Sequence, residues 1–117
     1  MPRILFPALI ATVMTSAVLA QGLMNTFKEV GLNNDDFGHL RSAGESLYTA
    51  ENPSIGSKAT WKNADTQSHG EVELTEFDGT CATMEHLFRV GATKEVFKMP
   101  ARRCKSEDGQ WLIAPLE

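Results

Sequence analysis

The chain has 117 residues, and its 11 Lys and Arg residues against 15 Asp and Glu residues give a net charge of −4 at pH 7. There is no basic surplus to attract nucleic acid or anionic lipid, so we expect neither as a partner. The length suits one small domain.

The first twenty residues have the composition of a secretory signal peptide. Arg3 supplies a positive charge, an apolar stretch runs from Ile4 to Leu19, and small residues occupy the −1 and −3 positions before Gln21. The stretch is shorter than the roughly 20 apolar residues that cross a bilayer, and Pro7 interrupts it. We therefore expect residues 1–20 to be removed on export, with an uncleaved membrane anchor as the alternative.

The positions of the two cysteines bear on where the exported protein is located. Cys81 and Cys104 are far from the predicted cleavage site, so the new N-terminus has no cysteine to acylate as in a lipoprotein. We expect a periplasmic or extracellular protein without stable membrane insertion after cleavage, a location that also allows association with the outer membrane. Loss of Arg3 makes the net charge one unit more negative.

The same two cysteines predict a disulfide, because exported chains meet an oxidising environment. Joining Cys81 to Cys104 stabilises a small domain by roughly 3 kcal/mol in the chain-entropy treatment. Two free thiols or a redox pair are the alternatives, but the spacing lacks the C-x-x-C pattern of redox motifs.

Two helical patterns follow the signal peptide. Residues 22–31 carry apolar side chains at helical spacing, and Gly31 favours a helix end there. Residues 34–36, Asn-Asp-Asp, offer capping oxygens and negative charge for a second helix whose apolar stripe ends near Tyr48. We expect both stripes to face the core, with a partner groove as the alternative.

From residue 58 the pattern changes to strands separated by turn-forming residues. We expect strands over residues 59–62, 69–77, about 81–90, 94–104 and 110–114. Short turns between consecutive strands favour an antiparallel meander. The predicted fold class is α+β, with two short N-terminal helices followed by a small antiparallel meander of four to five strands and one disulfide. A single domain would span residues 21–117, helical over 22–50 and β-sheet over 58–114.

The hairpin between the two cysteines has a predictable register. If Ala92-Thr93 form a two-residue loop, Gly91 pairs with Lys94, and Cys81 lies opposite Cys104. A bulge or longer turn would shift this pairing, and Ala-Thr is not a favoured two-residue turn. One face then carries Met84, His86 and Phe88 opposite Ala101, Met99 and Phe97, and the other carries Glu85, Arg89, Lys98 and Arg102.

Large aromatic side chains are expected to anchor the core. They are Trp61 and Trp111 on short strands, and Phe88 and Phe97 on the apolar face of the hairpin. An exposed pair of tryptophans would instead indicate a binding patch.

No pattern in the chain indicates catalysis, a metal or a cofactor. His39, His69 and His86 lack metal-ligand spacing, and we expect His86 to be a hydrogen-bonded core histidine. No nucleophile elbow or phosphate loop is present, and residues 34–36 lack the alternating acids of a calcium loop. The acidic residues of 71–76 alternate with apolar ones, as on the solvated face of a strand. We therefore predict a protein that is not an enzyme.

A set of short motifs runs from about Ala43 to Ile113. It comprises Trp61-Lys62-Asn63-Ala64-Asp65-Thr66-Gln67-Ser68-His69-Gly70, then Cys81, Arg103-Cys104 and Asp108-Gly109-Gln110-Trp111. This order resembles the C-terminal domain of bacterial surface antigens of the rickettsial seventeen-kilodalton type. The lipobox cysteine and Gly-rich membrane segment of those antigens are missing, and Ala82 stands where they usually have Arg. The resemblance implies a cell-envelope location, a small β-rich disulfide domain and no recognised enzymatic activity.

The sequence thus predicts a non-catalytic, exported cell-envelope protein of the periplasm, surface-antigen-like, that acts as a protein-binding or structural module. Its partner would be another envelope protein. The alternative is a small secreted or periplasmic inhibitor of a hydrolase such as lysozyme or a protease. Loop 63–68 or loop 105–109 would then enter the cleft of the target.

Overall fold

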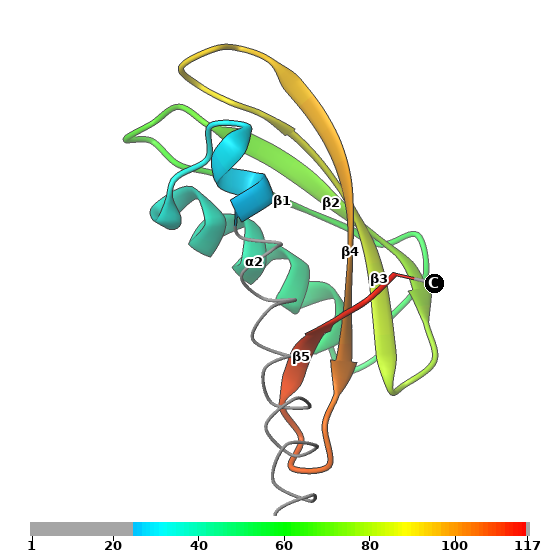
Figure 1. Ribbon diagram of the computed structural model, residues 1–117. Coiled ribbons are helices and arrows are strands. Elements are labelled where there is room, and N and C mark those ends of the chain that lie inside the picture. Colours follow the sequence, from blue (N-terminus) through cyan, green and yellow to red (C-terminus); the bar gives the residue numbers. More distant parts are fainter. Residues whose placement is uncertain (1–24, 117) are drawn as a thin grey trace, which may run out of the picture.

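The computed structural model describes residues 25–116, and its five antiparallel strands form one sheet in the order β1-β2-β3-β4-β5. The strands are β1 (Lys58–Lys62), β2 (His69–Phe77), β3 (Cys81–Arg89), β4 (Val96–Lys105) and β5 (Trp111–Ala114). Helix α2 (Asn34–Tyr48) lies along one face of the sheet, which bends around it (Figure 1). A short helix over residues 25–29 precedes α2. The predicted α+β meander is confirmed.

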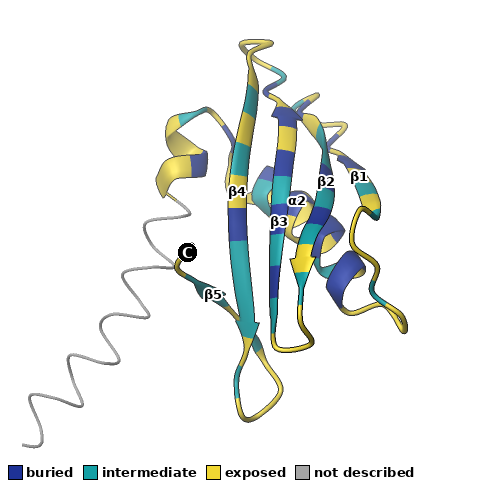
Figure 2. Cartoon of the chain, turned by 90° about the vertical axis from the view of Figure 1, so that its right-hand side faces the viewer, coloured by how far each residue is buried: buried dark blue, intermediate teal, exposed yellow. Residues whose placement is uncertain are grey.

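Alternation along the strands gives the sheet two chemically different faces. The inner face, toward α2, carries apolar side chains such as Val72, Leu74 and Met84, all at most 2% exposed. Glu71 and Glu73 lie on the outer face and are partly exposed. Figure 2 shows buried and more exposed positions alternating along β2 and β3. A period-two pattern with one apolar side is what a half-buried antiparallel sheet requires.

The hairpin of β3 and β4 has the predicted register but a longer loop. Cys81 pairs with Cys104, and a disulfide joins them, as expected. The two-residue loop is wrong, because Val90 donates its N–H to the Glu95 carbonyl at 2.9 Å and residues 91–94 form the turn. Lys94, the last residue of the turn, has a φ of 63°. A two-residue turn would instead require such positive φ values at its central residues, which Ala92 and Thr93 disfavour.

The start of α2 differs from the prediction by one residue. Asn33, rather than residues 34–36, is the N-cap: its side chain accepts a hydrogen bond from the Asp36 N–H at 2.7 Å. In turn, the Asp36 carboxylate accepts a hydrogen bond from the Asn33 N–H at 3.0 Å. This reciprocal capping box satisfies two of the free N–H groups at the helix start.

The Asp36 carboxylate also holds the turn between β1 and β2. Asp36 is 1% exposed, and its Oδ1 accepts hydrogen bonds from Asn63 Nδ2 at 2.8 Å and Thr66 Oγ1 at 2.6 Å. The second N–H of the Asn63 amide donates to Asp35 at 2.9 Å, and the Asn63 Oδ1 accepts from the Asp65 N–H. Each polar atom of this buried amide therefore has a partner, as a buried polar group needs.

The tip of the β3–β4 hairpin packs on the same turn. Gly91 donates its N–H to Ser68 Oγ at 3.0 Å. A Cβ atom at Gly91 would lie 1.9 Å from the Thr66 carbonyl oxygen, so only glycine fits there. The helix start, the turn over residues 63–68 and the hairpin tip thus form one connected unit.

The aromatic residues expected in the core differ in how deeply they lie. Trp61 and Phe88 are 7% and 1% exposed. Trp61 crosses over Gly70, where an added Cβ would lie 2.8 Å from the indole nitrogen. Trp111 is half-buried against Tyr48, with ring centroids 4.6 Å apart, and Phe97 is half-buried and stacked on Phe88 at 5.7 Å.

Residues 1–20, the predicted signal peptide, and residues 22–24 of the predicted first helix lie outside the described part of the chain. Where that first helix is described, it spans residues 25–29, and Gly31 follows with a φ of 107°. Across residues 25–116, no helix has the length and apolar character needed to cross a membrane.

The Asn63 amide supplies a first testable prediction. Asn63→Ala removes a donor from the buried Asp36 carboxylate, so we expect the free energy of unfolding to fall by about 3 kcal/mol. Urea unfolding followed by tryptophan fluorescence measures this loss. Asn34→Ala, an exposed change in the first turn of α2, is the matched control and should stay within about 0.5 kcal/mol of the native chain. Equal effects of the two substitutions would contradict the role given to Asn63.

Candidate functional site

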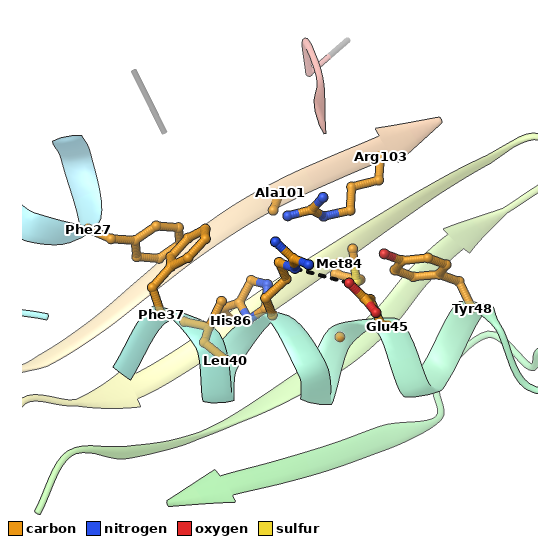
Figure 3. Close-up of a pocket in the computed structure, with 11 residues that line it drawn as sticks. Phe27, Phe37, Leu40, Glu45, Tyr48, Met84, His86, Ala101 and Arg103 are labelled. Atoms are coloured by element: carbon orange, nitrogen blue, oxygen red, sulfur yellow. Dashed lines mark hydrogen bonds and ion pairs between the residues drawn. The ribbon is translucent and has the colours of Figure 1, made fainter. Parts of the chain in front are cut away.

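A small opening, here called the α2 cleft, lies between α2 and the inner face of β3 and β4 (Figure 3). Apolar side chains make up most of its wall. The free volume is about 10 Å³, room for one water molecule. Its lining residues are Phe27, Phe37, Leu40, Arg41, Gly44, Glu45, Tyr48, Met84, His86, Ala101 and Arg103.

His86 lines the α2 cleft and is 3% exposed. Its burial agrees with the sequence prediction, but the expected hydrogen bond is missing, since Nδ1 has no partner among the described residues. Burial, together with the positive charge of Arg103, lowers the pKa of His86 to about 4. The ring is therefore neutral at pH 7 and a weak base.

Tyr48 and Arg103 bring unpaired donors to the cleft. The Tyr48 hydroxyl is buried without a hydrogen-bond partner in the described chain, and burial raises the Tyr48 pKa. Arg103 is half-buried on the inner face of β4, and within residues 25–116 no hydrogen bond or ion pair reaches its guanidinium. Burial lowers the Arg103 pKa, yet a guanidinium stays charged at neutral pH.

An ion pair occupies the rim of the cleft. Arg41 Nε lies 3.0 Å from Glu45 Oε1, one helical turn away on α2. Glu45 is paired with Arg41 and also acts on Arg103 at longer range, so two cations face one carboxylate in the cleft. The cleft therefore has a net positive charge in a protein whose total charge is negative.

A second depression, here called the outer-face groove, lies on the side of the sheet away from α2. It has a free volume of about 350 Å³ and crosses four strands. Leu87 and Val96 are 46% and 53% exposed there. Polar residues surround this apolar pair, namely Thr60, His69, Glu71 and Arg89.

The two loops suggested for entry into a hydrolase differ in how they are attached to the rest of the fold. Loop 63–68 is fixed to α2 through Asn63 and Thr66. Loop 105–109 projects past the end of the sheet (Figure 2) and is exposed over residues 107–109. Ser106 orders it by donating its hydroxyl to Asp108 and accepting the Gln110 N–H, and Gly109 adopts a φ of 88°.

Arg103 and Tyr48 were not predicted from the sequence as part of a candidate site. A signal for Arg103 was present, because the correct hairpin register places it on the inner face with Phe97, Met99 and Ala101. A lone cation in an apolar row is unusual and indicates a partner or a function. Tyr48 gave no such signal, since it reads as the last apolar residue of α2.

Within residues 25–116, no group of three His, Cys, Asp or Glu side chains is arranged to hold a metal ion. Compared with protein-family models, curated proteins and solved structures, the chain has no significant match. The resemblance to surface antigens therefore stays a prediction.

The buried histidine makes stability depend on pH. Its pKa is about 4 in the folded chain, against 6.5 for an unperturbed histidine. The unfolded chain therefore binds more protons between these values, and the free energy of unfolding falls as the pH drops from 6.5 to 4, by about 3 kcal/mol. Urea unfolding at a series of pH values measures the slope.

Substitution isolates the contribution of His86 from that of the carboxylates. His86→Gln removes the titrating ring and should flatten the curve between pH 6.5 and 4, whereas His69→Gln, an exposed change, should leave it unaltered. An unchanged slope in His86→Gln would show that other groups carry the dependence.

Proposed function

We propose that the protein is a non-catalytic, exported cell-envelope module that binds another envelope protein through the outer face of its sheet. The observation that carries the proposal is the exposure of Leu87 and Val96 in the outer-face groove. These two side chains contribute little to the buried core, so folding alone does not account for large apolar residues at these positions.

The arrangement around the apolar pair matches the plan of a protein interface. Such interfaces have an apolar centre and a polar rim that excludes water. Arg89 and Glu71 give this rim both signs of charge, which would fix the orientation of a partner. Groove and rim together are open and shallow, a shape suited to another protein surface.

The outer face is large enough for a small specific interface. Strands β2, β3 and β4 contain 9, 9 and 10 residues. At ~3.3 Å per residue and ~4.8 Å between strands, the five-stranded face measures about 30 by 20 Å. About 600 Å² on each partner is at the lower end of specific complexes.

Export is supported by the disulfide and by the predicted signal peptide together. A bridge between Cys81 and Cys104 persists in oxidising compartments and is rare in the cytosol of most organisms. The non-catalytic part is supported by the weak basicity of His86 and by the small volume of the α2 cleft.

The test compares capture by the native protein and by a groove variant. The Leu87→Gln/Val96→Gln double variant removes the apolar centre without adding charge. Immobilised native protein should retain a specific protein from an envelope extract of the organism that encodes it. The double variant should bind that protein at least about tenfold more weakly, as loss of interface anchors does.

The control is Ile55→Gln, which makes the same kind of change at a connector residue that is 62% exposed. Circular dichroism checks that all variants fold. Capture that is equal in the native and groove variants, or no specific capture at all, would refute the proposal.

A second candidate function is inhibition of a hydrolase, and the ordered projection of loop 105–109 favours it. A rigid loop enters a cleft at less entropic cost than a mobile one. Assays of the purified protein against lysozyme and a panel of proteases would detect inhibition, and an Asp108→Ala/Gly109→Ala variant should abolish it. Full activity of every enzyme in the panel would remove this candidate.

A further inference from the structure

The first part of β4 has one edge along which no other strand is paired. Strand β4 spans Val96–Lys105, but β5 pairs with it only from Arg102 to Lys105. Figure 2 shows β5 beside the lower end of β4 only. Within residues 25–116, β3 is therefore the only strand that pairs with β4 over residues 96–101. The side of this stretch away from β3 is here called the β4 edge.

The hydrogen bonds at the two ends of the β3–β4 hairpin show which residues of β4 are bonded to β3. Val90 donates its N–H to the Glu95 carbonyl, and Lys105 donates its N–H to the Thr80 carbonyl. Hydrogen-bonded pairs alternate with non-bonded pairs along an antiparallel ladder. The odd-numbered residues of β4 therefore direct their N–H and C=O groups toward β3.

The even-numbered residues of β4 direct the same groups to the other side. Ser106 donates its N–H to the Gln110 carbonyl, which places even-numbered residues in the bonded pairs with β5. Above the end of β5, the N–H and C=O groups of Val96 and Lys98 therefore point to a side where no strand of residues 25–116 lies. Pro100 adds a carbonyl there but has no N–H.

Apolar side chains lie on both faces of the sheet at the β4 edge. Val96 is 53% exposed on the outer face, and Phe97 and Met99 are half-buried on the inner face. Free edges are commonly protected by charged side chains that stand along them. Lys98 does not lie in this way, because its Nζ is 2.8 Å from Glu85 Oε1 on β3. The β4 edge is therefore suited to pairing with another strand.

The short helix over residues 25–29 packs on the inner face of the sheet rather than beside its edge. Its Phe27 contacts Phe37 and Phe88, with ring centroids 5.3 and 5.9 Å apart. Figure 1 shows the short helix on the side of the sheet where α2 lies. A strand added in the plane of the sheet would continue from β4 without replacing these contacts.

A second copy of the chain can pair with the β4 edge about a two-fold axis. Hydrogen-bonded pairs must join outward-directed residues, so Val96 can lie opposite Val96, Lys98 or Pro100 of the second copy. Pairing Val96 with Val96 places Lys98 opposite Lys94, and pairing Val96 with Pro100 places Lys98 opposite Lys98. Both arrangements bring like charges together, which is unfavourable.

The remaining register avoids this repulsion. Val96 lies opposite Lys98 of the second copy, so the N–H and C=O groups of both residues are bonded in both copies. Phe97 then lies opposite Phe97 of the second copy on the inner face, and aromatic cross-strand pairs stabilise a sheet. Pro100 falls opposite Lys94 at the end of the paired stretch, where its missing N–H costs no hydrogen bond.

We propose that the protein forms a symmetric homodimer through the β4 edge, with Val96 of each copy paired to Lys98 of the other. The contact is isologous, as in most homodimers, and it covers the unpaired edge of each copy. It is also short, so we expect a weak dimer with a dissociation constant on the order of 10 to 100 µM.

The dimer joins both copies in one continuous sheet, with the two outer-face grooves on the same side. Val96 lines the groove, and Lys98 of the second copy lies beside it in the dimer. Each copy therefore extends the groove of the other. Dimerisation is measured without any envelope protein, so it does not rest on the function proposed for the groove, and the two proposals can fail separately.

Sedimentation equilibrium of the purified protein between about 5 and 500 µM tests for the dimer. We expect the average mass to rise with concentration from that of the monomer toward twice that value. A mass that stays at the monomer value at the highest concentration would overturn the proposal.

Amide hydrogen exchange followed by NMR locates the contact in the native chain. The amides of Val96 and Lys98 should exchange several-fold more slowly at the highest concentration than at the lowest. The amides of β1, at the other edge of the sheet, should exchange alike at both concentrations. Protection that rises at β1, or that does not rise at Val96 and Lys98, would place the contact elsewhere and overturn the proposal.

Two variants at residue 98 separate the backbone from the side chain. Lys98→Pro removes an N–H that the β3–β4 ladder does not use, and edge strands accept proline, as Pro100 shows. Its dissociation constant should rise at least about tenfold. Lys98→Gln removes the charge but keeps the N–H, and it should dimerise within about threefold of the native protein.

Circular dichroism checks that both variants fold. Native-like dimerisation by folded Lys98→Pro, or an equal loss in both variants, would refute the pairing. If Lys98→Pro does not fold, hydrogen exchange in the native chain decides the question.

Discussion

The buried carboxylate of Asp36 is the contact on which the arrangement of this fold depends. It closes the capping box of α2 through the Asn33 N–H and accepts hydrogen bonds from Asn63 and Thr66, 27 and 30 positions along the chain. One side chain thus fixes where the helix begins and where the β1–β2 turn rests against it. A buried charge is tolerable here because three donors surround it. This anchor therefore helps to fix where α2 lies on the inner face of the sheet. The α2 cleft, which lies between them, depends on that position.

Much of the sheet could be predicted from the sequence, because strand alternation and the cysteine pair are local or nearly local signals. The register of β3 and β4 was predicted correctly although the loop was not. The observed turn has four residues in place of the predicted two. Gly91 and Lys94 therefore do not pair, but every other predicted pair of the hairpin is present. The disulfide fixes the same register at the other end of the hairpin. Two independent constraints on one ladder therefore agree, and the length of the loop has no effect on which side chains face the core.

The polar contacts could not be predicted in the same way. Nothing in a short stretch of sequence shows that Asn63 reaches the start of a helix 27 residues earlier, or that Tyr48 ends beside Arg103. Both depend on how far the helix lies along the sheet, which tertiary packing decides. The missing partner of His86 has the same origin: its strand position predicted burial correctly, but within residues 25–116 no group lies within hydrogen-bond distance of its Nδ1.

The roles of Trp61, Asn63, Thr66 and Gly70 limit what the surface-antigen resemblance can mean. Trp61 needs a glycine beneath it at position 70, while Asn63 and Thr66 hold the turn on α2. These four residues of the motif are therefore each held by a contact within the fold, whereas His69, another residue of the motif, lines the outer-face groove. A chain that shares the motif would be expected to share this docking of turn on helix, whatever it binds. Leu87 and Val96 line the same groove and lie outside the motif, so substituting them tests binding without removing the anchor of the fold.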